Sequence, residues 1–242
     1  MVNSNTFKPN NPGSASAAPQ AGAGKNSPQS LPVQIAGTGD EARGQIILDT
    51  TRTCLDVLQQ QGITEPGRIS ATIINAVADE LEIRNAAILS RSRKMNIPAT
   101  LEPFQLAEVL LTMHDIKKIC CLEKASDPDY DLLGIYQEDG PDMGTYSVSG
   151  YGIRSLCYKY VPEITRRGID EVEAVLSAKC GRVFRTKAKN LVPVNNGIFD
   201  FDTKKLIPYS KDYVFLGKCH VDYVNSPISP AIHNPKDNTD WE

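Results

Sequence analysis

The sequence lacks two features that would place the protein in or across a membrane. No apolar run approaches the roughly 18 residues that a membrane span needs. The N-terminus also lacks a basic start followed by an apolar stretch, so no secretory signal is recognised. The net charge of −3 argues against a strongly basic, stand-alone DNA-binding protein, although it leaves room for a local basic patch.

The six cysteines include no C-x-x-C pair. Most of them lie among apolar neighbours, where a free cysteine behaves as a small hydrophobic residue. This use of cysteine is typical of the reducing cytoplasm, so we predict a cytoplasmic protein without a membrane partner. A zinc site made by Cys180, Cys219 and His220 would have a spacing that fits no common zinc motif. We therefore expect no metal site and no cofactor.

No segment of the sequence fulfils the requirements of a nucleotide-binding loop, a calcium loop or a nucleophilic catalytic site. A phosphate loop around Lys25 would need glycine at Pro19 and serine or threonine at Asn26. The acidic run that begins at Asp127 has calcium-loop spacing, but Leu132 stands where the loop requires glycine. None of the three histidines lies near a nucleophile pattern, so the sequence indicates no catalytic residue.

The chain divides into four regions. Residues 1–39 are dominated by small and polar residues, which cannot bury enough surface to order a chain, and we predict a disordered tail. In residues 40–98, apolar stripes that begin at Ile47 and Ile69 have helical spacing and predict a helical hairpin. Residues 225–242 contain three prolines and are expected to form a linker or an unstructured tail.

Residues 99–224 mix both kinds of secondary structure. A helix is expected after Thr100, the predicted N-cap, and two more have apolar faces that begin at Ile153 and Ile169. A strand is expected where Phe199 and Phe201 alternate with aspartates. The other expected strands are 116–122, 132–136, 144–148, 206–207, 214–216 and 221–223. The sequence therefore predicts an α+β fold: a helical N-terminal region, then small antiparallel sheets and paired helices.

A basic stretch follows the last expected helix. It holds five cations with no acid among them, and Phe184 lies within it: Lys179, Arg182, Arg185, Lys187 and Lys189. A flexible basic arm of this kind could neutralise DNA phosphates without reading sequence. A solvated connector is an equally good interpretation.

A longer ordered pattern runs from Leu191 to Val224. A short apolar stretch leads into Asn-Gly, a strand with aspartate, a threonine turn, Leu-x-Pro-x-Ser and a closing Asp-Tyr. Its positions are Asn196, Gly197, Asp200, Thr203, Leu206, Pro208, Ser210, Asp222 and Tyr223. This segment resembles a signature of phage/plasmid primase–helicases, and weaker likeness extends back to about Thr100.

The resemblance implies a domain shared with poxvirus-type primase–helicases, which lies directly before a superfamily 3 helicase ATPase. It implies DNA and a helicase ATPase domain or subunit as partners, in replication of a mobile genetic element, and it leaves a homo-oligomer open. The ATPase would begin near Glu242, and nothing in residues 1–94 resembles a primase centre, which needs clustered carboxylates.

We therefore expect a non-catalytic module, whose parent would be an ATP-dependent DNA helicase or primase. It would position DNA or support helicase assembly. The alternative is an independent regulatory protein that derives from such a replicator and binds a helicase rather than DNA.

Overall fold

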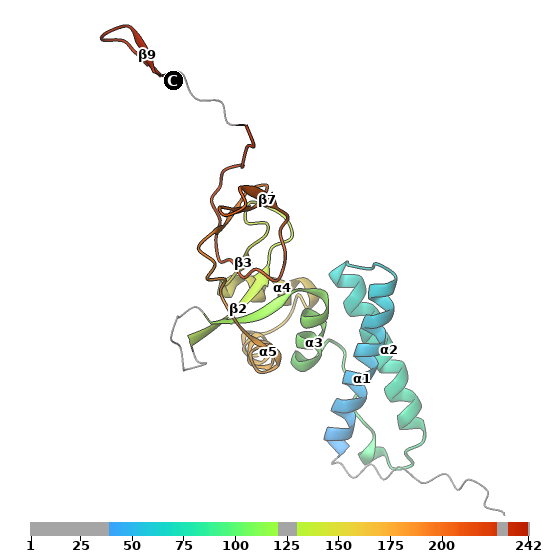
Figure 1. Ribbon diagram of the computed structural model, residues 1–242. Helices are drawn as coiled ribbons and strands as arrows, with labels where there is room; N and C mark the ends of the chain where they lie inside the picture. Colours follow the sequence, from blue (N-terminus) through green and yellow to red (C-terminus); the bar gives the residue numbers. More distant parts are fainter. Residues whose placement is uncertain (1–38, 121–129, 227–231, 242) are drawn as a thin grey trace, which may run out of the picture. The chain divides into compact units, whose positions relative to one another are not determined.

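The computed structural model describes residues 39–120, 130–226 and 232–241. Helices and small sheets both occur in this part of the chain, which confirms the predicted α+β class and the helical N-terminal region (Figure 1). Nearly all of the predicted tail, residues 1–39, lies outside the described residues. No helix among the described residues is long and apolar enough to cross a membrane.

The predicted helical hairpin consists of α1 (Gly39–Gln60) and α2 (Pro66–Ala86), which lie side by side (Figure 1). Gly62 ends α1 with φ +66°, a left-handed conformation that glycine adopts without steric cost. The backbone of Ile63 donates a hydrogen bond to the Leu58 carbonyl, which satisfies an end group of the helix. The stripes face inward, with Ile47, Leu55, Leu58, Ile69, Ile73, Val77 and Leu81 buried.

A 3-10 turn, η1 (Arg91–Arg93), precedes α3 (Pro103–Met113). The N-cap of α3 is Glu102, so the prediction of Thr100 was wrong. Pro103 provides a φ already suited to the first helical position, and the Gln105 side chain accepts a hydrogen bond from the Glu102 backbone. Local hydrogen bonding thus starts the helix two residues later than the threonine alone suggested.

The first sheet has four strands in the order β3-β2-β1-β4, with β4 at its edge. These are β1 (Ile116–Cys120), β2 (Asp131–Tyr136), β3 (Tyr146–Ser147) and β4 (Arg182–Phe184). Two helices, α4 (Gly150–Tyr160) and α5 (Arg166–Lys179), separate β3 from β4. Because such a long connection can return the chain in the same direction, β4 pairs parallel to β1, while the other pairs are antiparallel as predicted.

The second sheet is an antiparallel meander of β5 (Leu191–Val194), β6 (Gly197–Asp200) and β7 (Lys205–Ile207). The strands expected at 214–216 and 221–223 are absent from the structure. Both segments instead make isolated backbone hydrogen bonds, such as those from the Tyr146 amide to the Phe215 carbonyl and from the Asn195 amide to the Val221 carbonyl.

The C-terminal segment differs from its predicted form. The expected linker contains a two-stranded hairpin, β8 (Ile232–Asn234) and β9 (Thr239–Trp241). Asn238 adopts a left-handed φ of 57° in the turn, and the Asp237 carboxylate accepts hydrogen bonds from Thr239. Asparagine and aspartate are the residues that tolerate and stabilise such turns.

One hydrophobic cluster includes residues of all five helices. The helical region and the mixed region, which the sequence separates at residue 98, therefore share a core. A hydrogen bond of 2.8 Å from the Ser70 hydroxyl on α2 to the Tyr160 carbonyl on α4 joins them as well. In a smaller cluster, Val214 packs against Ile119 and Tyr146 of the first sheet.

Glu108 on α3 connects three helices through its carboxylate. Arg52 on α1 donates to it at 2.6 Å and Lys179 on α5 at 2.5 Å. Burial acts to raise the pKa of Glu108, but the hydrogen bonds from Arg52 and Lys179 outweigh it and hold the pKa below its ordinary value. The ionised carboxylate is thus the form that the fold stabilises.

Replacing this carboxylate tests the connection. We expect Glu108→Gln to lower the free energy of unfolding by about 1 kcal/mol at pH 7, a modest value because Arg52 and Lys179 are partly exposed. Since the folded pKa lies below the unfolded one, the wild type should lose this contribution as pH falls through the folded pKa. Urea unfolding at pH 7 and pH 4 should therefore show a smaller pH effect in the variant, and an equal effect would contradict the assignment.

Candidate nucleic-acid interface

The five predicted phosphate-binding cations do not form a single flexible arm. Lys179 ends α5 and is paired with Glu108. Arg182 lies in β4, which is paired with β1, and its guanidinium binds Asp131 of β2 with an Nε to Oδ2 distance of 2.7 Å. The side chain of Asp131 is fully buried. Two of the five cations are therefore engaged by carboxylates of the chain itself.

The other three cations gather around one hollow. Arg185, Lys187 and Lys189 line a cavity of about 460 Å³ whose opposite wall is the segment 214–217. Thr186 joins the two walls: its backbone amide donates to the Val214 carbonyl at 2.9 Å, and its hydroxyl accepts from the Val214 amide at 2.8 Å. None of the residues that line the hollow is acidic.

Phe184 directly precedes the first lining residue of this hollow, and the residue is 53% exposed. The Arg182 guanidinium carbon lies 5.6 Å from the ring centroid and the Lys187 ammonium 6.0 Å. The sequence placed Phe184 among the cations but gave it no role. The sequence signal that could have indicated a role for Phe184 was its position as an aromatic residue in a basic stretch with few other apolar residues.

Asn196 and Tyr223, both from the family pattern, hold the motif segment closed. The Asn196 side chain donates to the Tyr223 carbonyl at 2.9 Å and accepts from the Tyr223 amide at 3.0 Å. The Tyr223 ring stacks on Phe199, with centroids 4.5 Å apart. Gly197 has φ +151°, and a Cβ there would lie 2.6 Å from the Ile207 carbonyl oxygen, so only glycine fits.

The other residues of the primase–helicase-like pattern lie in a turn or on the surface. The Asp200 carboxylate accepts hydrogen bonds from the Asp202 amide, the Thr203 hydroxyl and the Asn190 side chain. These bonds, the one from the Asp202 amide first, lower the pKa of Asp200. Asp200 therefore stabilises the turn after β6, whereas Pro208 and Asp222 are exposed. Among the described residues, no group of three or more His, Cys, Asp or Glu is placed to bind a metal ion.

The Asn196 bridge gives a direct stability test. Asn196→Ala removes both hydrogen bonds to Tyr223, and we expect the free energy of unfolding to fall by about 1–2 kcal/mol. Urea denaturation measures the loss. Asn195→Ala removes the same side-chain amide from the adjacent position and serves as the matched control. If both variants lost equal stability, the bridge would have no special role.

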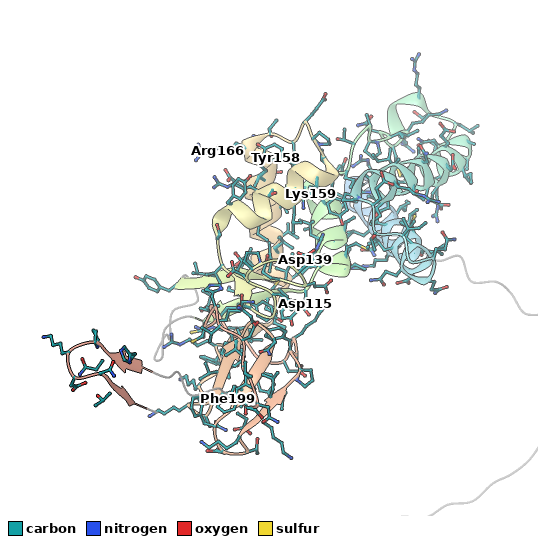
Figure 2. The ribbon with its side chains drawn as sticks, turned by 90° about the horizontal axis from the view of Figure 1, so that it is seen from above. Asp115, Asp139, Tyr158, Lys159, Arg166 and Phe199 are labelled. Carbon is teal, nitrogen blue, oxygen red and sulfur yellow. The ribbon has the colours of Figure 1, made fainter. Side chains whose placement is uncertain are left out.

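A second hollow, of about 560 Å³, was not anticipated from the sequence. It lies between the end of β2 and one face of α4, and its charged lining residues are Asp115, Glu138, Asp139 and Lys159. Figure 2 labels three of them, Asp115, Asp139 and Lys159. Lys211 already pairs with Glu138 at 2.7 Å. His114, also in the lining, has its pKa lowered by burial and by Lys159, and its Nε2 lies 3.2 Å from the Tyr160 hydroxyl. The acidic character of this hollow makes it unsuited to phosphates.

A third hollow, of about 400 Å³, lies over the second sheet and is mainly apolar. Its lining residues are Val192, Val194, Phe199, Phe201, Cys219, Val221, Asp222, Tyr223 and Val224. Phe201, Val221 and Val224 remain 48%, 60% and 60% exposed. Exposed apolar side chains that gather in this way are typical of surfaces that bind another protein.

No protein-family model matches the chain, and a comparison with curated proteins gives no match. The resemblance of Leu191–Val224 to phage/plasmid primase–helicases therefore stays a prediction from the sequence pattern.

Proposed function

We propose that the chain is a non-catalytic, helicase-adjacent module of a phage- or plasmid-type DNA replication protein, and that it holds DNA by the phosphates. The observation that supports DNA binding most strongly is the hollow lined by Arg185, Lys187 and Lys189 without an acid. The segment 182–226 carries eight Lys and Arg residues against four Asp, whereas the whole chain has a net charge of −3. The segment that supplies 214–217 and 185–189 to the hollow is thus more basic than the chain as a whole.

The replication role rests on the primase–helicase pattern and on where that pattern lies. One wall of the basic hollow, 214–217, belongs to the Leu191–Val224 segment, and the other wall, 185–189, directly precedes it. The segment that resembles the helicase-adjacent signature therefore forms part of the basic surface. A module of this kind would deliver DNA to a motor attached to it or assembled with it.

DNA binding is tested by fluorescence anisotropy with labelled single-stranded and duplex oligonucleotides over a range of salt. Each phosphate bound by a cation contributes a slope of about −0.7 for single strands in a plot of log affinity against log salt. Three contacts therefore predict a slope of about −2. Binding that does not depend on salt, or the absence of binding at low salt, would contradict the proposal.

The replication context has a separate test. The reading frame beyond Glu242, or the adjacent gene, should encode a Walker A motif within about a hundred codons. Co-expression of that ATPase with this chain should then yield a complex by size-exclusion chromatography. A genomic neighbourhood without an ATPase would remove the support for a helicase-adjacent role and leave only the DNA-binding proposal.

The second candidate is a regulatory protein that binds a helicase rather than DNA, and the apolar hollow over the second sheet favours it. In that case anisotropy would detect no DNA binding, while the chain would co-elute with the helicase. Val221→Asp and Val224→Asp together would abolish this complex, because two buried charges without partners disfavour an apolar interface. If the wild type binds DNA and the double variant binds it equally well, the result would favour the first candidate.

A further inference from the structure

Phe184 occupies an unusual place for an apolar ring. It ends β4, the edge strand of the first sheet, and successive side chains of a strand point to opposite faces. Val183 therefore points inward and packs against the cluster of Ile119, Tyr146 and Val214, while Arg182 and Phe184 share the outer face. Val183 packs within the sheet, whereas Phe184 remains 53% exposed to solvent.

The surroundings of the ring are held in place before any ligand binds. The buried Asp131 carboxylate binds the Arg182 guanidinium through two contacts, at 2.7 and 3.0 Å, which keeps it beside the ring. Lys187 lies near the same ring and also lines the basic hollow. A cation near an aromatic ring interacts favourably with its π-electrons, and here two cations lie within 6.0 Å of the centroid of one exposed ring.

The neighbouring residue connects the ring to the phosphate site. Arg185 follows Phe184 directly in the chain, and Lys187, whose ammonium lies 6.0 Å from the Phe184 ring centroid, lines the same hollow as Arg185. An aromatic platform and a cationic hollow therefore adjoin each other on the surface. Proteins that hold single-stranded nucleic acids combine these two elements, with bases stacked on aromatic rings and phosphates in a basic groove.

We propose that Phe184 is a stacking platform for an unpaired base, so that the DNA held by this chain is single-stranded. This inference rests on the proposed DNA binding. The ring receives the face of one base, and the hollow of Arg185, Lys187 and Lys189 receives the phosphates next to it. In a duplex each base face is already covered by its neighbours, so the platform adds nothing to duplex binding.

The test compares Phe184→Ala with wild type on three labelled probes: oligothymidine, a strand of the same length without bases, and a duplex. Stacking of one base predicts about a tenfold loss of affinity for oligothymidine. Affinity for the base-free strand and for the duplex should not change, because both retain phosphates but offer no free base. Phe201→Ala is the matched control, since Phe201 is similarly exposed and has Lys204 5.4 Å from its ring centroid.

Two results would overturn the stacking role while leaving DNA binding intact: unchanged affinity of Phe184→Ala for oligothymidine, or an equal loss on all three probes. An equal loss in Phe201→Ala would do the same. If the wild type bound none of the probes, the proposed function would fail and this inference with it. A fluorescence readout is independent: Phe184→Trp in a Trp241→Phe background leaves one tryptophan, which oligothymidine should quench and the base-free strand should not.

Discussion

Replacing Arg185, Lys187 and Lys189 together by glutamine should weaken single-stranded DNA binding about 100-fold at 0.1 M salt. A slope of about −0.7 per phosphate means that each contact contributes about fivefold at this salt concentration, and three contacts multiply. The salt slope itself should approach zero, because few bound counterions would remain to be released. Anisotropy titrations of wild type and variant at several salt concentrations measure both quantities.

A matched variant separates a local site from overall charge. Arg68, Arg91 and Arg93 are exposed cations of α2 and η1, and their replacement by glutamine changes the net charge by the same amount. This control should bind DNA almost as the wild type does. If it lost as much affinity as the hollow variant, binding would depend on the net charge alone and the hollow would not be the site.

The second large effect is expected at Gly144, where alanine should lower the free energy of unfolding by about 3–4 kcal/mol. Gly144 has φ +87°, a conformation that disfavours any side chain, and a Cβ would collide with the ring of Tyr209. The Tyr209 hydroxyl donates a hydrogen bond to the Val194 carbonyl, so the ring cannot move away without breaking a contact to the second sheet. Urea unfolding followed by circular dichroism measures the loss.

Gly140 provides the control because it shares one of these two penalties. Its φ is +77°, but a Cβ there would meet no atom within 4 Å. Gly140→Ala should therefore cost only the backbone strain, about 1 kcal/mol. Equal losses in the two variants would show that the contact between Gly144 and Tyr209 adds nothing.

Helices were predicted more reliably than the strands of the C-terminal half. The helical stripes span several turns, and their apolar residues all enter one core, so the periodic signal is long. The segments 214–216 and 221–223 show short apolar alternation, yet each makes single backbone hydrogen bonds in place of a ladder. Asp237 and Asn238 are residues that favour a turn, but the three prolines of 225–242 led to the prediction of a linker instead of a hairpin.

The basic stretch was visible from the sequence, but its division into two parts was not. Lys179 pairs with Glu108, 71 residues away, and Arg182 with Asp131, 51 residues away. Local charge patterns cannot reveal such partners, because only the fold brings them together. The other wall of the hollow was equally hidden, because the segment 214–217 contains no charged residue that would indicate a phosphate site.

The closed loop between Asn196 and Tyr223 has a consequence for how this segment could be inherited. Because one side chain holds both backbone polar groups of Tyr223, the segment leaves its host at almost the same point where it entered. A piece of chain with adjoining ends can be exchanged between proteins as a cassette, since its host needs no change in spacing to accept it.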